Sequence, residues 1–349
     1  MKKSNKCPVF FPKAAEIRQF PMNTPPILSQ EELGCAMQKL RALAAAMNQV
    51  LFGQKDLIEL VLIGVLARGH ILLEGLPGLG KTELVKGLSR ALDITARRVQ
   101  FTPDLLPGDI TGTPVLQERD GTKNFIFQEG PVFANIMLAD EINRASPKTQ
   151  SALLEAMQER RVTVMGETHA LPSPFFVLAT QNPIELEGTF PLPEAQLDRF
   201  MFLIEVDYPT EEEEMRIARE TTGTRSEELK HILSGEEIIF YQDLVRRVPV
   251  PEHIYEYAVK LVRATRPTLE TSPEWVKQYV AWGAGPRAVQ FLILGAKTRA
   301  ALQGSYIVRR EDIDAIVEPV LMHRVVTNFA AESQGITPRK AVARLAAEI

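Results

Sequence analysis

The segment GLPGLGKT, from Gly75 to Thr82, has the residue types and spacing of a phosphate-binding loop. Glycines let such a loop curl closely, so that backbone N–H groups converge on a chain of phosphates. An apolar run at 71–74 leads into the loop, and a helical pattern begins at Lys81, where a helix N-terminus favours anions. Lys81 would reach the β- and γ-phosphates, and the Thr82 hydroxyl would ligate Mg²⁺. The predicted nucleotide-binding residues, as opposed to a plain glycine turn, are Gly75, Pro77, Gly78, Leu79, Gly80, Lys81, Thr82 and Glu83.

An acidic pair, Asp140 and Glu141, follows the apolar run IMLA. A carboxylate at the C-terminal end of a buried strand is placed to hold Mg²⁺ through its water shell. Glu141, one residue on, is placed to polarise an attacking water as a general base. The pair therefore favours hydrolysis of the nucleotide over transfer of its phosphoryl group to another substrate. The alternative is an Asp-Glu pair that only caps the next helix.

The elements that must position these groups alternate in type from His70 onward. Apolar runs that are nearly continuous, separated by helical patterns, indicate an α/β fold with a parallel sheet covered on both faces. The expected strands are 71–74, 97–101, 135–140, 175–180 and 200–206. The expected helices are 33–47, 56–67, 81–92 and one that Ser146 opens as N-cap with Pro147 at its first position.

Two segments break this alternation and predict inserted β-hairpins. The first, 112–127, pairs TPVLQ with NFIF across an Asp120-Gly121 turn. The second, 161–171, pairs two short alternating runs around 165–167.

The character of the chain changes after Pro209. Thr210 and Glu213 form a capping box at the start of an acidic helix, and the later patterns predict helices at 252–265, 274–282, 286–302 and 310–323. We expect three parts: a proline-rich N-terminal arm at 1–32, an α/β domain at 33–208 and a small all-helical domain at 209–349. The arm is either extended or packed on the body as an irregular strap.

Composition places further limits on the class of protein. A chain of 349 residues suits about two domains, and a net charge of −4 gives no electrostatic footprint for nucleic acid. Cys7 and Cys35 provide no disulfide framework. The longest apolar stretch, 60–67, falls short of the roughly 18 residues that span a bilayer, and the start of the chain does not match a secretory signal. We expect a cytoplasmic protein without a membrane span.

Four segments, in this order and spacing, resemble the MoxR family of AAA+ ATPases: GLPGLGKT, LADEINRASPKTQSALLEAMQE, ATQNPIELEGTFPLPEAQLDRF and GAGPRA. The resemblance runs from about residue 36 to the C-terminus. It implies an AAA+ core with a parallel sheet, flanking helices and inserted β-hairpins, followed by a small helical lid. It also implies a homo-oligomer, usually a hexameric ring, that hydrolyses ATP with Mg²⁺ at sites between subunits.

The resemblance assigns roles to several polar residues. Asn182 matches sensor 1, which helps to position the attacking water, although it is also suited to an Asn-Pro turn. Arg199 matches the arginine finger that reaches a neighbour's γ-phosphate, or else forms a surface ion pair with Asp198. Arg287 matches sensor 2, acting either on its own site or on a neighbour's site.

Two further assignments are less specific. Arg144 either is a second arginine that reaches across the interface between subunits, or forms a salt bridge at the start of a helix. The segment 50–54 resembles the part of the family that flanks adenine, which makes Phe52, Gly53 and Gln54 candidates for contacts to the base.

The resemblance points to a chaperone-like motor that remodels or matures a protein client, for example by aiding insertion of a metal or cofactor. Members of the family often act with a protein that carries a von Willebrand factor A domain. The alternatives are a nucleotide-switched scaffold and a nucleic-acid motor of the same clade. Nucleic acid is disfavoured by the net charge and by hairpins with little basic or aromatic character beyond Lys123, Phe125 and Phe127.

Overall fold

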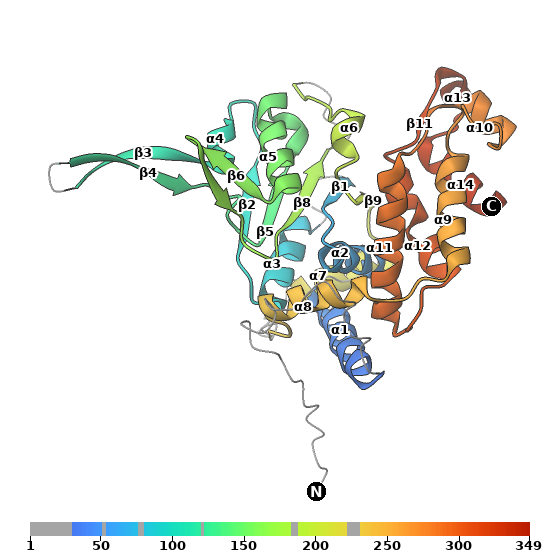
Figure 1. The fold of residues 1–349 in the computed structure, drawn as a ribbon, viewed down its shortest axis with the longest axis horizontal. Coiled ribbons are helices and arrows are strands. Elements are labelled where there is room, and N and C mark those ends of the chain that lie inside the picture. The colour runs from blue at the N-terminus through green and yellow to red at the C-terminus, as the bar shows by residue number, and fades with distance from the viewer. Residues whose placement is uncertain (1–29, 51–53, 76–79, 120–121, 183–187, 222–230) are drawn as a thin grey trace, which may run out of the picture.

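A parallel sheet forms the centre of the computed structural model, which describes residues 30–50, 54–75, 80–119, 122–182, 188–221 and 231–349. Its five strands lie in the order β2-β5-β8-β1-β9 (Figure 1). Every neighbouring pair is parallel. The bounds are β1 (Ile71–Gly75), β2 (Ala96–Gln100), β5 (Ile136–Asp140), β8 (Phe176–Gln181) and β9 (Phe202–Val206). The predicted α/β core is confirmed.

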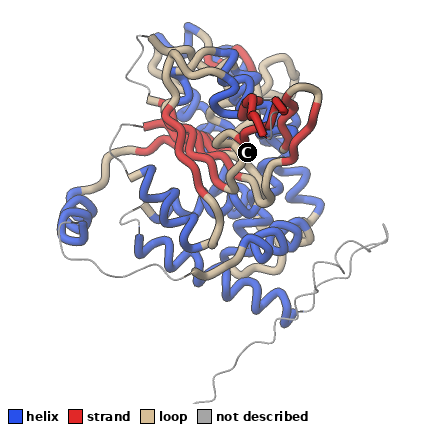
Figure 2. Tube along the Cα trace, turned by 90° about the vertical axis from the view of Figure 1, so that its left-hand side faces the viewer, coloured by secondary structure: helices blue, strands red, loops and turns tan. Residues whose placement is uncertain are grey.

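Successive side chains of the central strands enter two different apolar layers, because they point to opposite faces of the sheet. On β1, Ile71 and Leu73 face one layer and Leu72 faces the other. The first layer contains side chains of α1 (Gln30–Val50), α2 (Lys55–Leu66) and α3 (Lys81–Ala91), and the second contains side chains of α5 (Pro147–Glu159). Figure 2 shows the twisted sheet between helices. Coverage on both faces explains the nearly continuous apolar strands.

Both predicted hairpins are present as separate two-stranded sheets. One joins β3 (Gly112–Arg119) to β4 (Thr122–Glu129), and Figure 1 shows these two strands projecting from the body. The predicted Asp120-Gly121 turn lies outside the described residues. The other joins β6 (Arg161–Val164) to β7 (Glu167–Ala170). Phe127 stacks on His169, with 4.0 Å between ring centroids, so the two hairpins touch.

The sheet is followed by a mainly helical region. It contains α7 (Glu211–Thr221), α8 (Gly235–Arg246), α9 (Glu252–Ala264), α10 (Glu274–Tyr279), α11 (Pro286–Gln303), α12 (Arg310–Leu321), α13 (Phe329–Ser333) and α14 (Pro338–Glu348). The capping box at the start of α7 is present, because Thr210 N–H donates to Glu213 Oε2 (2.9 Å) and Glu213 N–H to Thr210 Oγ1 (3.4 Å). Helices α11 and α12 pack against α2 and β9, which joins this region to the sheet.

Two predictions in this region need correction. The helix expected at 274–282 ends at Tyr279, and β10 (Val280–Trp282) pairs with β11 (Val326–Thr327), so the region is not all-helical. A long-range strand partner overrides the local helical pattern at this point. Helices α8 and α14 were not predicted. Within the described residues, no helix combines the length and apolar character needed to cross a bilayer.

Candidate active site

The predicted phosphate-binding loop starts at the end of β1 and finishes at the start of α3. A side chain on Gly75 would lie 2.7 Å from the Val206 carbonyl oxygen of β9, so only glycine fits there. Gly80 has a φ of 76°, in the left-handed region that favours glycine. Lys81 Nζ donates to Gly75 O at 2.8 Å. The remaining predicted loop residues, Pro77, Gly78 and Leu79, lie outside the described residues.

Lys81 lies in the electrostatic field of both predicted carboxylates. Partial burial lowers the pKa of Lys81, and the negative charges of Asp140 and Glu141 oppose that shift. The structure therefore brings together the lysine and the acidic pair, which are 59 and 60 residues apart along the chain. Thr82 is half-buried in the first turn of α3, whereas the Glu83 side chain is exposed and pairs with Lys86 at 2.7 Å.

Asp140 ends β5 with both carboxylate oxygens engaged. Thr180 Oγ1 on the neighbouring strand β8 donates to Oδ1 at 2.7 Å. From the other side, the Arg98 guanidinium donates to Oδ2 through Nε at 3.1 Å and through Nη2 at 2.7 Å. The carboxylate is thus fixed between a buried hydroxyl and an exposed cation.

Glu141 adopts a left-handed backbone conformation, with a φ of 55°. Its N–H donates to Thr180 Oγ1 at 2.9 Å, so a single hydroxyl binds both members of the acidic pair. The Glu141 carboxylate accepts from Gln100 Nε2 at 2.6 Å and from Arg144 Nη1 at 3.0 Å. Arg144 therefore makes the salt bridge that was one of its two predicted roles. A non-glycine residue in this conformation is typical of functional sites.

Asn182 directly follows β8 and is buried. Asn143 Nδ2 lies 3.5 Å from its carbonyl oxygen. Because β5 and β8 are parallel neighbours, Asn182 lies at the same edge of the sheet as the acidic pair. The sequence analysis did not identify Thr180 as part of the site. The only indication in the sequence is that a hydroxyl residue lies near the end of an otherwise apolar run.

Gln54 lies at the start of α2, and its neighbours Phe52 and Gly53 are outside the described residues. It lines a hollow of about 620 Å³ between the sheet and the helical region. Val206, Tyr208 and Pro319 line the same hollow. Since Val206 also abuts Gly75, this hollow adjoins the phosphate-binding loop.

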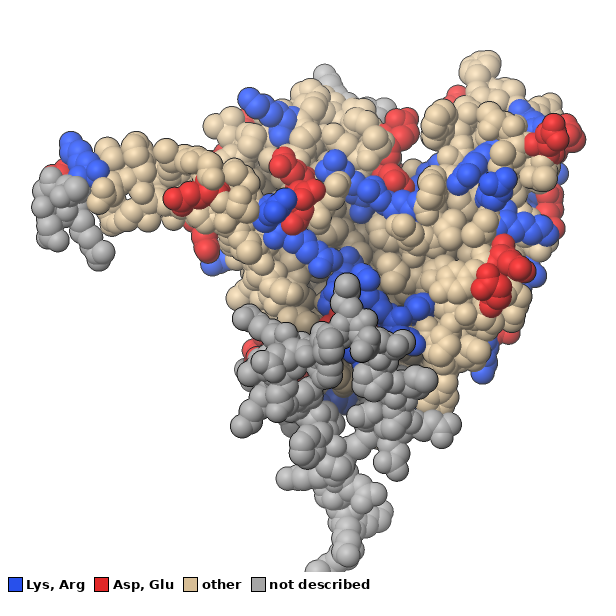
Figure 3. All heavy atoms as spheres, viewed as in Figure 1, with Lys and Arg blue, Asp and Glu red and all other residues tan. Residues whose placement is uncertain are grey.

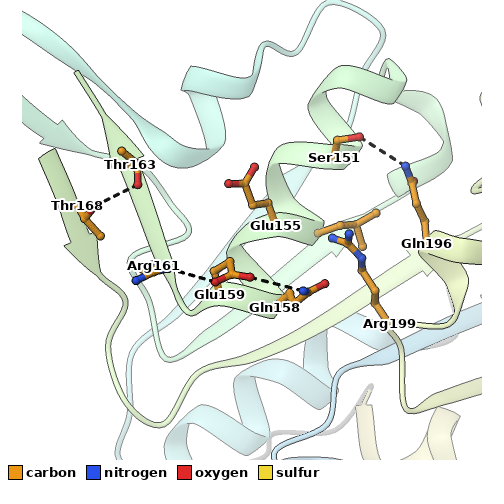
Figure 4. A pocket seen from close by; sticks show the side chains of 10 residues that line it. Ser151, Glu155, Gln158, Glu159, Arg161, Thr163, Thr168, Gln196 and Arg199 are labelled. Carbon is orange, nitrogen blue, oxygen red and sulfur yellow. Dashed lines mark hydrogen bonds and ion pairs between the residues drawn. The ribbon is translucent and has the colours of Figure 1, made fainter. Parts of the chain in front are cut away.

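Arg199 lines a different hollow, of about 550 Å³. Figure 4 shows its side chain extending toward α5, opposite the β6–β7 hairpin. Among the described residues that line this hollow there is no member of the phosphate-binding loop or of the acidic pair. Within one chain, Arg199 therefore lines a hollow other than the one that adjoins the phosphate-binding loop.

The ion pair considered for Arg199 is formed by other residues. Asp198 Oδ2 pairs with Arg287 Nη1 at 3.2 Å, and Asp198 Oδ1 pairs with Arg324 Nε at 2.7 Å. Arg287 is in the first turn of α11, and Arg324 follows α12. Sequence reasoning did not find Arg324, because no local spacing links it to Asp198.

Comparison with known proteins agrees with this architecture. Residues 70–202 match the family model "ATPase family associated with various cellular activities (AAA)", and residues 273–345 match "AAA lid domain". The chain is 42% identical over 325 residues to Chaperone MoxR1 of Mycobacterium tuberculosis, covering 93% of this chain and 85% of that protein. It is 33% identical over 317 residues to Protein MoxR of Paracoccus denitrificans, covering 84% of this chain and 90% of that protein.

A solved structure shows the same fold. The crystal structure of a protein from Cytophaga hutchinsonii, assigned as an ATPase, superposes with a TM-score of 0.85 at 40% identity, covering 91% of this chain and 97% of the other. A sheet with a phosphate-binding loop, an acidic pair at its edge and a helical lid accords with these relatives. The chain belongs to the MoxR family of AAA ATPases, and it is an ATPase of that family.

Proposed function

We propose that this ATPase works as a homo-oligomeric ring in which each active site is completed by Arg199 of a neighbouring subunit. The observation that supports the proposal is that Arg199 lines a hollow whose lining residues do not include Lys81, Asp140 or Glu141 of the same chain. An arginine finger supplied by a neighbour is worth ~10³ to 10⁵ in rate in other P-loop enzymes. A hexamer is the ring size that the resemblance to the family implies.

We assign nucleotide binding to the β1–α3 loop. Its backbone N–H groups and Lys81 would hold the phosphates, while Gly53 and Gln54 would contact the base from the adjoining hollow. Thr82 and Asp140 offer a hydroxyl and a carboxylate, oxygen ligands of the kind that Mg²⁺ prefers. When bound there, the ion would neutralise charge on the phosphates.

Hydrolysis then depends on how this chain orients a water molecule. Glu141 is the general base in this proposal, and Thr180, Gln100 and Arg144 fix its backbone and carboxylate. Asn182, at the same edge of the sheet, would bind the same water. Arg287 would transmit the nucleotide state to the lid.

For the cellular role we propose chaperone-like remodelling of a protein client in the cytoplasm. The relative from Mycobacterium tuberculosis is named a chaperone. The β3–β4 hairpin exposes apolar side chains on both of its faces: Leu116 (52% exposed) and Phe125 (64%) on one, Val115 (42%) and Ile126 (45%) on the other. In Figure 3 it is an arm with few charged side chains on the visible face. Such a surface suits contact with apolar segments of another protein.

A protein with a von Willebrand factor A domain, and insertion of a metal or cofactor into the client, are parts of the proposal that rest on the family resemblance alone. They can be tested by copurification of a partner and by activation of a client enzyme.

The first experiment measures ATPase rate per subunit against protein concentration, with Glu141→Gln as the blank. We expect specific activity to rise with concentration, because Arg199 must enter a neighbour's site, and Arg199→Ala to reduce the curve to background. A flat curve with substantial activity would show that each subunit works alone, and the shared site would have to be abandoned.

A further inference from the structure

Arg324 reaches from the lid into the segment that carries Arg199. Its side chain is only 2% exposed, although it follows α12 in a helical region. The guanidinium donates to Asp198 Oδ1 at 2.7 Å, to Asp198 O at 3.0 Å and to Phe200 O at 2.6 Å. It therefore binds the residues immediately before and after Arg199.

Asp198 is held by two arginines that both come from the lid. Arg287 approaches Oδ2 at 3.2 Å from the start of α11, while Arg324 approaches Oδ1 from the end of α12. These helices pack tightly on each other. A movement of the α11–α12 pair would consequently be transmitted to residue 198, one of the two residues adjacent to Arg199 along the chain.

The Arg324 cation is kept in an unusual environment. Burial lowers the pKa of Arg324 to about 10, and the negative charge of Asp198 opposes that shift. The group therefore remains charged at neutral pH. A buried cation is unfavourable unless its donors are satisfied, and here a carboxylate and backbone oxygens satisfy them, including those of Met201 and Val320. The planar fork of arginine suits this set of acceptors better than lysine would.

The alternative is that Arg324 only holds the lid against the sheet domain, without any effect on Arg199. The chain contains other arginines that make such contacts. Arg299 on α11 pairs with Glu59 on α2 at 3.2 Å and with Asp312 at 3.0 Å. Arg339 on α14 pairs with Glu205 on β9 at 2.9 Å. Both tie the lid to the sheet domain, but the residues that they pair with lie outside the 198–200 segment. Arg299 and Arg339 are therefore examples of lid contacts that do not involve the residues next to Arg199.

We propose that Arg324, acting through Asp198, is a positioning residue that sets the reach of Arg199, so that the lid of one subunit controls hydrolysis in the adjacent subunit. This inference rests on the proposed shared site. Arg324 does not touch the reacting atoms in this scheme. A displacement of about 1 Å at a catalytic group costs on the order of 10²-fold in rate, so a modest shift of the segment suffices.

The test is complementation between subunits of full-length protein. Arg324→Gln subunits keep an intact nucleotide site, but their Arg199 is poorly positioned for the neighbouring site. Glu141→Gln subunits position Arg199 correctly but cannot activate water in their own site. Co-expressed one to one, they should give more ATPase activity than the sum of the separate variants. In a head-to-tail ring about a quarter of the sites combine the two intact halves, so recovery should approach about a quarter of wild-type.

Arg199→Ala mixed with Glu141→Gln is the reference experiment. If this reference pair recovers activity and Arg324→Gln does not, the coupling through Arg324 is wrong while the shared site stands. If the reference pair also fails, the shared site itself is wrong. Separately, Arg324→Gln should lower kcat by about 10- to 100-fold with the KM for ATP changed less than about twofold.

Two variants separate positioning from folding. Arg324→Lys keeps the charge but loses the fork, so its kcat should lie between those of wild-type and Arg324→Gln. Arg41→Gln removes an exposed contact between α1 and the lid, the hydrogen bond from the Arg41 guanidinium to Gln303 O, and should leave kcat within about twofold of wild-type. An equal loss of kcat in Arg41→Gln, or loss of nucleotide binding in Arg324→Gln, would show that the lid contacts only hold the fold together.

Discussion

The acidic edge of the sheet and the Arg199 segment are built in contrasting ways. Asp140, Glu141 and Thr180 are fixed by short hydrogen bonds between adjacent parallel strands, which leave them little room to move. The 198–200 segment is instead held by side chains of the lid, more than 80 residues further along the chain. We infer that the edge is a rigid chemical centre and that the Arg199 segment is the adjustable part.

Removal of Arg199 gives the largest expected effect and tests the adjustable part directly. Arg199→Ala should reduce kcat by ~10³ to 10⁵, because it deletes a charge that is needed only in the transition state. The Kd for ATP, measured by equilibrium binding, should change little. A large loss of ATP affinity would instead place Arg199 in ground-state binding.

Removal of the general base tests the rigid part. Glu141→Gln should reduce kcat by ~10² to 10⁴ while ATP still binds, because the amide keeps the shape of the side chain but cannot accept the proton. Single-turnover rates with prebound ATP provide the measurement. Glu274→Gln, which breaks an exposed pair with Lys277, is a matched control with no expected loss.

Thr180→Val probes how much the rigidity of the edge contributes. The variant removes the hydroxyl that donates to Asp140 and accepts from Glu141 N–H. We expect kcat to fall by about 10-fold and the free energy of unfolding to fall by about 1–3 kcal/mol, because buried polar groups lose their partner. Thr180→Ser should retain most of both quantities. If Thr180→Val is as active as wild-type, the hydroxyl does not orient the pair.

Acidification should weaken the folded state through a buried histidine. His70 accepts from Val177 N–H (3.0 Å) and contacts Met157 O (3.2 Å), and burial lowers its pKa to about 4. Since the unfolded chain binds the proton more readily, stability is full above pH ~6.5 and declines as the pH falls toward 4, by up to about 3 kcal/mol.

Urea unfolding at pH 7 and pH 5 measures this effect. Burial also lowers the pKa of His323, beside Arg324, so the same direction is expected there. His70→Gln should reduce the dependence on pH between 4 and 6.5 and leave the contribution of His323. A slope unchanged by that substitution would contradict the assignment to His70.

The sequence sufficed for features that depend on neighbours along the chain. The strands with nearly continuous apolar character, both hairpins and the capping box at Thr210 were predicted and are present in the structure, as are the described ends of the glycine-rich loop, Gly75 and Gly80. Each of them arises from a local pattern that a parallel sheet or a turn requires. The assignment of roles to individual site residues stays a prediction until the variants above are measured.

The remaining features arise from contacts between distant segments. Tyr279 ends α10 because β10 pairs with β11, some 45 residues later. The pairing of Asp198 with Arg287 and Arg324 likewise depends on how α11 and α12 pack, which no spacing in the sequence encodes. In the sequence, Thr180 does not differ from other residues of a buried strand. Its role depends on the pairing of β5 with β8, which brings its hydroxyl to Asp140.

The β3–β4 hairpin carries a cost for the isolated subunit. Its strands pair only with each other as a two-stranded sheet, so each has an outer edge of backbone N–H and C=O groups, and it displays apolar side chains on both faces. Open edges and apolar surface are the features that drive edge-to-edge aggregation. A subunit with no other protein bound to this hairpin should therefore be the form most prone to precipitate, and a protein that binds other chains would itself need protection during synthesis.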